Sequence, residues 1–368
     1  GCIGIVPCGS LGEGATLTYD EKVELIRICV KAVPGTPIIP GIASLSTAEA
    51  VALAKESERL GCGGLMVLPP YVYSTDWREM KAHVSAIIAA TKLPCMLYNN
   101  PPAYKTDFLP AQIAELAAEH RNLEAVKESS GDSRRVTAIR HLLGDRLTIL
   151  VGMDDCILEG VAAGARGWIA GLVNAFPVES VELYEAAMIG DRETADEIYK
   201  WFLPLLRLDT VPKFVQHIKW VQSKVRGSNP SVRGPRLALD GADLARLLGA
   251  WGACTGCPED VTGDGNVLGL TIDELLVDLV ADDRGLRMPR DHLAERLHLV
   301  GREERHYCTC AVTLASSMGE TPLIRMSVNM NGTSTVRGSV PCSPPPLPPP
   351  KRTPLTVSVV VPSVSSLY

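Results

Sequence analysis

A lysine at the end of an apolar segment is the residue best suited to covalent chemistry in this chain. Lys127 closes the run Leu123 to Glu128 in the sequence EAVKESSGD. Strand interiors seldom hold lysine, and a partly desolvated lysine presents a neutral amine that can attack a carbonyl or imine carbon. The alternative is a lysine that reaches solvent or pairs with a carboxylate such as Glu13 or Glu128. Taken alone, Lys127 leaves both interpretations open.

Two further segments bring hydroxyl groups to the ends of predicted strands. The sequence GSLGEG, residues 9–14, follows an apolar run. Its small residues allow backbone amides to approach an anion, and Ser10 adds a hydroxyl. Tyr98 ends another apolar run, in LYNNPP. Taken alone, residues 9–14 are explained at least as well by a tight turn without a ligand as by an anion site. Tyr98 is explained at least as well by a packed side chain as by a catalytic role.

The elements that must position these residues alternate regularly up to about residue 250. Seven short apolar runs are each followed by a longer amphipathic stretch, which predicts parallel strands covered by helices. An α/β barrel of this kind carries its active site at the carboxyl ends of its strands, where Ser10, Tyr98 and Lys127 are expected. The predicted strands are Ile3 to Cys8, Pro37 to Ile42, Gly63 to Pro69, Pro94 to Asn99, Leu123 to Glu128, Leu147 to Gly152 and Gly167 to Leu172.

Helices are expected between and after these strands. Ser46 with Glu49 three residues on predicts a capping box at the start of one of them. Seven strand–helix units are one fewer than the eight that close a TIM barrel, which indicates an open sheet or a barrel lacking its first unit. The predicted helices lie near residues 19–32, 46–60, 76–90, 110–119, 133–143, 154–163, 178–188, 192–207, 210–225 and 240–249.

Composition restricts the class of partner. The chain has 368 residues and 36 Lys and Arg against 42 Asp and Glu, a formal net charge of −6. This balance argues against nucleic acid or an anionic membrane as the main partner. No apolar run approaches the roughly 18 residues of a membrane-spanning helix, and the start at Gly1 shows no signal peptide. Scattered cysteines in apolar segments favour buried, reduced thiols and a cytoplasmic location: Cys2, Cys8, Cys29, Cys62, Cys95 and Cys156.

The character of the chain changes after Trp251. The segment 251–368 has no further Trp and no Phe, and it ends in a Pro-rich stretch at residues 341–352. These features predict a largely irregular or disordered extension that follows a first domain at residues 1–250. The Pro-rich stretch could bind an SH3-like module, although a passive tail is the favoured interpretation.

Two metal-binding patterns in the extension are weak. DVTGDGNV, which begins at Asp260, resembles the opening of a calcium loop, but Thr271 stands where the last carboxylate belongs. A plain turn is favoured there. A zinc site would need four cysteines drawn from a CxxC and a distant CxC, and we expect no metal. These cysteines are Cys254, Cys257, Cys308 and Cys310.

Together, the three motifs resemble the dihydrodipicolinate synthase and N-acetylneuraminate lyase superfamily, whose members are class I Schiff-base lyases on TIM barrels. They occur in the order GxxGE at residues 9–13, YNxP at 98–101 and KE[SA][ST]G at 127–131. The resemblance also takes in GMDD at 152–155 and GARGWIAGLVN at 164–174, and it extends from Gly1 to about Ala250. It implies another strand and helix before Gly1, so we expect a truncated barrel.

The resemblance implies roles for individual residues. Lys127 is similar to the Schiff-base lysine and Tyr98 to the proton shuttle of the family. Ser10, with its neighbours Gly9 and Leu11, stands where the family holds the substrate carboxylate. No metal or organic cofactor is implied beyond the covalent Schiff base on Lys127.

Three more residues match positions around the family's pocket. Tyr71 resembles a tyrosine contributed across a subunit interface, which implies a homo-oligomer, a tetramer in the family. Ile169 matches a position that lines the pocket through its backbone, and Gly152 matches a glycine that leaves room for substrate. The implied ligand is a small 2-oxo acid or cyclic imino acid.

Two residues depart from the pattern of dihydrodipicolinate synthases and restrict the range of substrates that we expect. Leu11 replaces the second hydroxyl of dihydrodipicolinate synthases, and Ala103 replaces their semialdehyde-binding arginine, for which Lys105 could partly substitute. GSLGE, YNNPPAYKTD and FLPLLRLDTVPKFVQHIK are similar to the branch that deaminates 1-pyrroline-4-hydroxy-2-carboxylate to 2-oxoglutarate semialdehyde and ammonia in hydroxyproline catabolism. The alternatives are a pyruvate-dependent aldolase, an enzyme similar to 4-hydroxy-tetrahydrodipicolinate synthase, and an inactive barrel remnant.

Overall fold

The computed structural model describes residues 1–71 and 76–255. Within them, five parallel strands pair in chain order, each with the next along the sequence. The calcium-like loop, Cys257, the CxC pair and the Pro-rich stretch lie outside the described residues. The strands are β1 (Gly41–Ile42), β2 (Leu65–Val67), β3 (Cys95–Asn99), β4 (Leu123–Glu128) and β5 (Thr148–Val151).

The first and last of the seven predicted strands are reduced to single parallel bridges. Ile5 bridges Ile38 on one side of the series, and Trp168 bridges Val151 on the other. The prediction of full strands at 3–8 and 167–172 was therefore wrong in extent, as was the early start of the strand at 37–42. Proline explains part of this, because Pro7, Pro37 and Pro40 carry no amide hydrogen for a ladder.

Alternate residues of the strands point into one interior. Strand side chains alternate between two faces, so one set of every second residue fills the inside of a barrel. This interior cluster combines residues of the central strands with residues of the first and last predicted runs, and the series of segments therefore curves around a common centre. The TIM-barrel fold class is confirmed. The cluster contains Val6, Ala43, Met66, Leu68, Met96, Tyr98 and Ile169.

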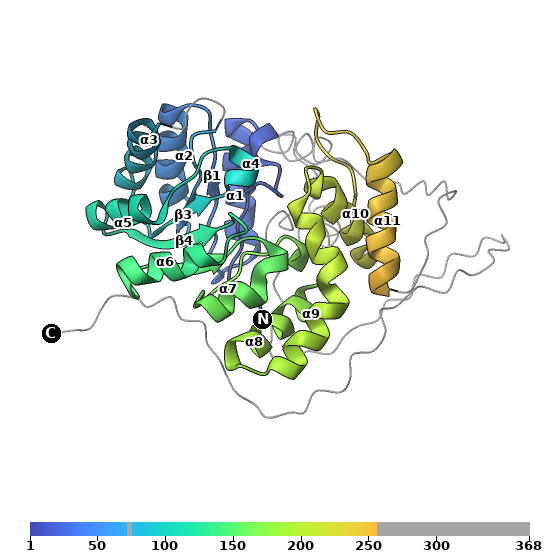
Figure 1. Ribbon diagram of the computed structural model, residues 1–368. Helices are drawn as coiled ribbons and strands as arrows, with labels where there is room; N and C mark the ends of the chain where they lie inside the picture. The colour runs from blue at the N-terminus through green and yellow to red at the C-terminus, as the bar shows by residue number, and fades with distance from the viewer. Residues whose placement is uncertain (72–75, 256–368) are drawn as a thin grey trace, which may run out of the picture.

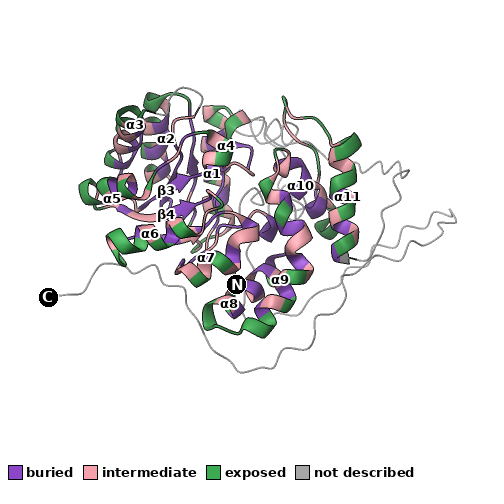
Figure 2. Cartoon of the chain, viewed as in Figure 1, coloured by how far each residue is buried: buried purple, intermediate pink, exposed green. Residues whose placement is uncertain are grey.

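Helices cover the outside of the strands, and the larger part of the core lies between the two layers (Figures 1 and 2). Most predicted helices are confirmed to within a few residues. The helices before residue 164 are α1 (Tyr19–Ala32), α2 (Thr47–Arg59), α3 (Trp77–Ala89), α4 (Pro101–Tyr104), α5 (Pro110–Glu119), α6 (Arg134–Leu143) and α7 (Ile157–Ala163). The short α4 was not among the predicted helices. Short 3-10 turns include η1 (Gly14–Thr16), η2 (Asp154–Cys156) and η3 (Leu172–Asn174).

The capping box predicted before α2 is only half formed. Ser46 caps the helix by accepting from the Glu49 amide at 3.4 Å, but the Glu49 carboxylate accepts from the Ser44 hydroxyl at 2.8 Å. Ser44 also accepts from the Ser46 amide, and so it takes the place that Glu49 would fill in a complete box. A complete capping box forms instead at α1, between Thr18 and Glu21.

Four helices pack together beside the barrel (Figure 1): α8 (Pro177–Ile189), α9 (Arg192–Leu206), α10 (Phe214–Arg226) and α11 (Gly241–Thr255). The turn η4 (Arg207–Thr210) joins α9 to α10. The helix expected to end near residue 249 continues to Thr255, because Trp251 packs edge-on against Trp220 and the Cys254 carbonyl accepts from Trp201. None of the described helices is long and apolar enough to cross a membrane.

A buried carboxylate connects these helices to the first loop of the barrel. Glu13 is 1% exposed and accepts a charged hydrogen bond from Lys219 of α10 at 2.8 Å. The backbone amide of Arg233 donates to the second Glu13 oxygen, also at 2.8 Å. An ion pair this well hydrogen-bonded is costly to break, because the remaining partner would be buried without its counter-charge. Glu13 therefore holds α10 in place against the loop that carries Ser10.

Candidate active site

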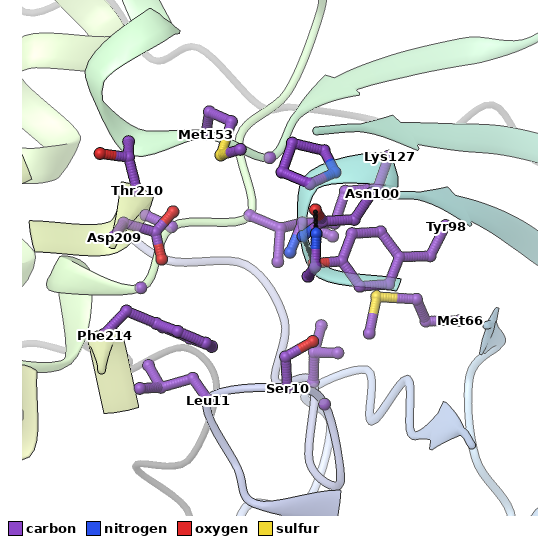
Figure 3. A pocket seen from close by; sticks show the side chains of 18 of the residues that line it. Ser10, Leu11, Met66, Tyr98, Asn100, Lys127, Met153, Asp209, Thr210 and Phe214 are labelled. Carbon is purple, nitrogen blue, oxygen red and sulfur yellow. Dashed lines mark hydrogen bonds between the residues drawn. The ribbon is translucent and has the colours of Figure 1, made fainter. Parts of the chain in front are cut away.

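A cavity of about 490 Å³ lies at the carboxyl ends of the strands, and Figure 3 shows the side chains around it. Residues from the strand ends form one side, here called the strand wall: Ser10, Tyr98 and Lys127. Residues from η4 and the start of α10 form the facing side, here called the helix wall: Asp209, Thr210 and Phe214. The structure thus brings together the three predicted residues from motifs spread over more than a hundred positions.

Lys127 and Tyr98 are direct neighbours across two strands. Their Cα atoms are paired in the register of β3 and β4, so both side chains point to the same face of the sheet. The Lys127 Nζ lies 4.4 Å from the centre of the Tyr98 ring, and Lys127 is 9% exposed. The two carboxylates considered as its partners are engaged elsewhere. Glu13 pairs with Lys219, and Glu128 accepts from Asn99 and from the Ser130 amide.

The loop after β3 is built to orient Tyr98. Asn100 caps α4 through its side-chain oxygen, which accepts from the Ala103 amide at 3.1 Å. Its side-chain nitrogen donates to the Tyr98 hydroxyl at 2.8 Å. The preceding Asn99 is fully buried and hydrogen-bonds both Asp107 and the Phe108 amide, which closes the loop at its far end. The YNNPP sequence therefore fixes the phenol of Tyr98 and the helical turn beside it.

That turn carries Tyr104, which the sequence analysis missed. The Tyr104 hydroxyl is hydrogen-bonded to Ser10 Oγ. Its ring packs edge-on against Tyr98, with centroids 5.8 Å apart, and tilted against Tyr71 at 5.5 Å. Burial, the first cause, and the neighbouring Tyr98 raise the pKa of Tyr104, so the phenol stays protonated. A signal was present: two prolines after a capping asparagine start a helical turn that returns the next tyrosine toward the strand end.

The other predicted residues are placed as follows. Gly9, Leu11 and Ile169 line the cavity. Gly152 also lines it, and a Cβ there would lie 1.9 Å from Ser129 Oγ and 2.7 Å from Lys127 Cε. The space beside Gly152 is therefore taken by the lysine side chain itself. Tyr71 packs behind Tyr104 and is not among the described residues that line the cavity.

Ala103, one of the two departures from the synthase pattern, lines the cavity, as does the other, Leu11. Lys105 also lines the cavity, and its ammonium donates to the Pro102 carbonyl at 2.8 Å. Pro102 belongs to α4 and Lys105 is the residue that ends this helix, so the hydrogen bond holds the Lys105 side chain against α4.

The helix wall contributes an acid that the sequence analysis also missed. Asp209 follows α9 in the sequence LLRLDTVPK and lines the cavity together with Lys127. Burial raises the pKa of Asp209 to about 6, although the charge of Lys127 opposes the shift. The signal in the sequence was weak: Asp209 is an acid between leucines and Thr210 at a helix end that also carries Arg207, and this pattern does not reveal which strand the acid will face.

Comparison with known proteins agrees with this arrangement. Residues 1–246 match the model of the dihydrodipicolinate synthetase family. The chain is 32% identical over 248 residues to a 4-hydroxy-tetrahydrodipicolinate synthase of Mesorhizobium japonicum, which covers 67% of this chain and 85% of that protein. It is 35% identical over 249 residues to the enzyme of the same name from Geotalea daltonii, with 66% and 84% covered.

Solved structures give the same result. The 4-hydroxy-tetrahydrodipicolinate synthase of Methylacidiphilum fumariolicum SolV superposes with a TM-score of 0.66 at 29% identity, covering 69% of this chain and 85% of that one. Dihydrodipicolinate synthase from Aquifex aeolicus superposes with a TM-score of 0.64 at 28% identity, covering 67% and 85%. With two thirds of its residues matched by the family model and the same barrel around the cavity, the chain belongs to the dihydrodipicolinate synthetase family.

Proposed function

We propose that the protein is a Schiff-base lyase in which Lys127 is the nucleophile. One observation carries the proposal: a largely buried lysine, without either of its expected carboxylate partners, lies beside a tyrosine in a cavity at the carboxyl ends of parallel strands. A lysine in that position forms an imine with a carbonyl carbon or exchanges with an existing imine. The family membership supports the same chemistry.

The rest of the cavity supports a proposal for the substrate class. We assign a substrate carboxylate to the Ser10 loop, where small residues and a hydroxyl suit an anion. Tyr98 and the Ser10–Tyr104 pair supply hydroxyls that can carry protons near the reacting carbon. Such a site takes a small 2-oxo acid or a cyclic imino acid. No cofactor is needed, because the imine on Lys127 is itself the electron sink.

Within this class, we propose deamination of 1-pyrroline-4-hydroxy-2-carboxylate to 2-oxoglutarate semialdehyde. Lys127 would add to the ring C=N carbon, and the ring nitrogen would leave as an amine while the lysine imine forms. Ala103 supports this choice, since it stands where the resemblance places the semialdehyde-binding arginine of the synthases. The acidic Asp209 supports it as well, because a carboxylate on the cavity wall favours a substrate that carries a protonated nitrogen.

The second candidate is a 4-hydroxy-tetrahydrodipicolinate synthase or a related pyruvate-dependent aldolase. The names of the relatives favour it, and Lys105 on the cavity edge could contact the second substrate. For either candidate we propose a cytoplasmic homo-oligomer, with Tyr71 close to a subunit interface. Light scattering on the purified chain tests the oligomer, and a monomer at micromolar concentration that retains activity would contradict it.

Borohydride trapping tests the proposed chemistry. The protein is incubated separately with pyruvate and with 1-pyrroline-4-hydroxy-2-carboxylate, reduced, and digested for peptide mass spectrometry. We expect a reduced adduct on Lys127 with both, and release of ammonia only with the pyrroline. Faster labelling by pyruvate without ammonia release would favour the synthase or aldolase. No adduct from either compound, on protein with the circular dichroism of a folded α/β domain, would refute a Schiff-base enzyme.

A further inference from the structure

The helix wall carries one acid, Asp209, to which the proposed function assigns a charge but no proton-transfer step. Asp209 lies in η4, and Figure 3 shows its carboxylate in the cavity on the side opposite Tyr98. Among the described residues, the backbone amide of Asp154 donates a hydrogen bond to one carboxylate oxygen of Asp209, at 3.4 Å. A single long hydrogen bond leaves a carboxylate able to accept or donate toward a ligand.

Asp154, the acid next to Asp209, has a structural role. Asp154 is fully buried, and its carboxylate accepts from the amides of Gly171 and Leu172 and from Trp168 Nε1, at 2.8–3.2 Å. These bonds hold the last barrel segment against η2. Asp154 is therefore committed to the fold, while Asp209 is the member of this acidic pair that faces the cavity.

Several groups together set the pKa of Asp209 at about 6. Burial is the largest cause and raises the pKa, and the charge of Asp155 acts in the same direction, whereas the Lys127 ammonium and the Asp154 amide lower it. The cations beside η4 interact with other acids. Lys213, at the start of α10, forms an ion pair with Asp243 at 2.9 Å, and the charge of Arg207, at the end of α9, lowers the pKa of Asp155. A group with this balance can both take up and release a proton near pH 7.

We propose that Asp209 is the acid–base residue that removes the C3 proton of the Lys127-bound substrate and returns it to a hydroxyl leaving from C4. The inference rests on the proposed Schiff-base function and deepens it. It identifies the substrate class as 2-oxo or cyclic imino acids that carry a hydroxyl two carbons from the imine carbon.

The step balances without another reactant. The Asp209 carboxylate takes the C3 proton, and the C3–H electron pair forms the C2=C3 bond, which neutralises the iminium on Lys127. The enamine then forms the C3=C4 double bond as the C4–O bond breaks. The proton held by Asp209 leaves with that oxygen as water, which restores both the iminium and the Asp209 carboxylate.

Deuterium exchange isolates the first half of this step. Pyruvate has no leaving hydroxyl, so its Schiff base can only exchange its methyl protons, and NMR in D2O follows this exchange directly. We expect the Asp209→Asn variant to retain the borohydride adduct on Lys127 but to lose exchange by about a hundredfold or more. Wild-type exchange should fall below a pH near 6, and this acid limb should be absent from the variant.

Two further variants separate catalysis from folding. Asp209→Glu keeps the acid and should recover part of the exchange rate, whereas an altered fold would not be rescued. Asp155→Asn removes a neighbouring acid that does not line the cavity, and we expect both adduct and exchange to stay within severalfold of wild type.

The failures are distinguishable. An Asp209→Asn variant that forms the adduct and exchanges at the wild-type rate overturns the role of Asp209 and leaves the Schiff-base function standing. A wild-type protein that forms no adduct at all overturns the proposed function, and the role of Asp209 with it.

Discussion

The strand wall and the helix wall of the cavity are built in different ways. Lys127 and Tyr98 are held by the backbone register of two adjacent strands, where hydrogen bonds leave little freedom. Asp209 sits on a short turn between two helices, and side-chain contacts such as Glu13 with Lys219 hold the α10 side of that wall against the barrel. On the proposed function, the sheet would position the covalent chemistry, and the added helices would select the substrate that reacts there.

Removing Lys127, the proposed nucleophile of the strand wall, should have the largest effect. We expect Lys127→Ala to lower turnover by roughly a thousandfold or more and to abolish the trapped adduct, because no other group on this wall can form an imine. Mass spectrometry after borohydride reduction measures it. Lys105→Ala is the control, since Lys105 also borders the cavity and its loss should leave the adduct in place. An adduct that persists in Lys127→Ala would move the chemistry to another lysine.

The hydroxyl pair of Ser10 and Tyr104 ranks second. Tyr104→Phe removes the hydrogen bond to Ser10 but keeps the ring packed against Tyr98, and we expect kcat/KM to fall about 10- to 100-fold. Tyr184→Phe is the control within this chain, because the Tyr184 hydroxyl has no hydrogen-bond partner among the described residues and Tyr184 does not line the cavity. Steady-state kinetics compares the two variants. A Tyr104→Phe variant that keeps the kcat/KM of Tyr184→Phe would show that ring packing, rather than the Tyr104 hydroxyl, matters on this wall.

A smaller effect should follow from crowding the lysine. A Cβ at Gly152 would collide with Ser129 Oγ and the Lys127 side chain, so Gly152→Ala should displace the amine and slow adduct formation about tenfold. The rate of borohydride-trapped product against time measures it. Gly249→Ala is the control, because a methyl group there meets nothing within 4 Å. A Gly152→Ala variant that labels at the wild-type rate would mean that the lysine is not held by this contact.

The smallest effect concerns the stability of the helix wall. The pKa of Asp209 rises from about 3.8 to about 6 on folding, so the native protein binds more protons than the unfolded chain, and stability is lost as pH rises through this window. Asp209→Asn should therefore raise the free energy of unfolding by about 1–3 kcal/mol at pH 8, above both pKa values, and by far less at pH 3, below both of them. Urea unfolding at the two pH values measures this. An equal gain at both would assign the effect to packing instead of charge.

The amino-acid sequence by itself determined the strand wall. Seven apolar runs, each followed by an amphipathic stretch, specify a parallel barrel, and such a fold brings Ser10, Tyr98 and Lys127 to the same end. Local signals of this kind are strong because side-chain periodicity and strand-end position depend on neighbours in the sequence. The predicted strands at 3–8 and 167–172 were too long. Prolines interrupt the hydrogen bonding near the first segment, and each segment forms a single bridge to one neighbour among the described residues. The apolar composition of a segment does not indicate how many strands it will pair with.

Only the tertiary structure determined the position of Asp209 on the helix wall and of Tyr104 between Tyr98 and Tyr71. Asp209 faces Lys127 across a sequence distance of more than eighty residues, and no periodicity encodes that contact. Tyr104 meets Ser10 because an asparagine cap and two prolines turn the chain back after β3. Both placements depend on helix packing and loop closure, which act between distant segments and carry no repeating pattern along the chain.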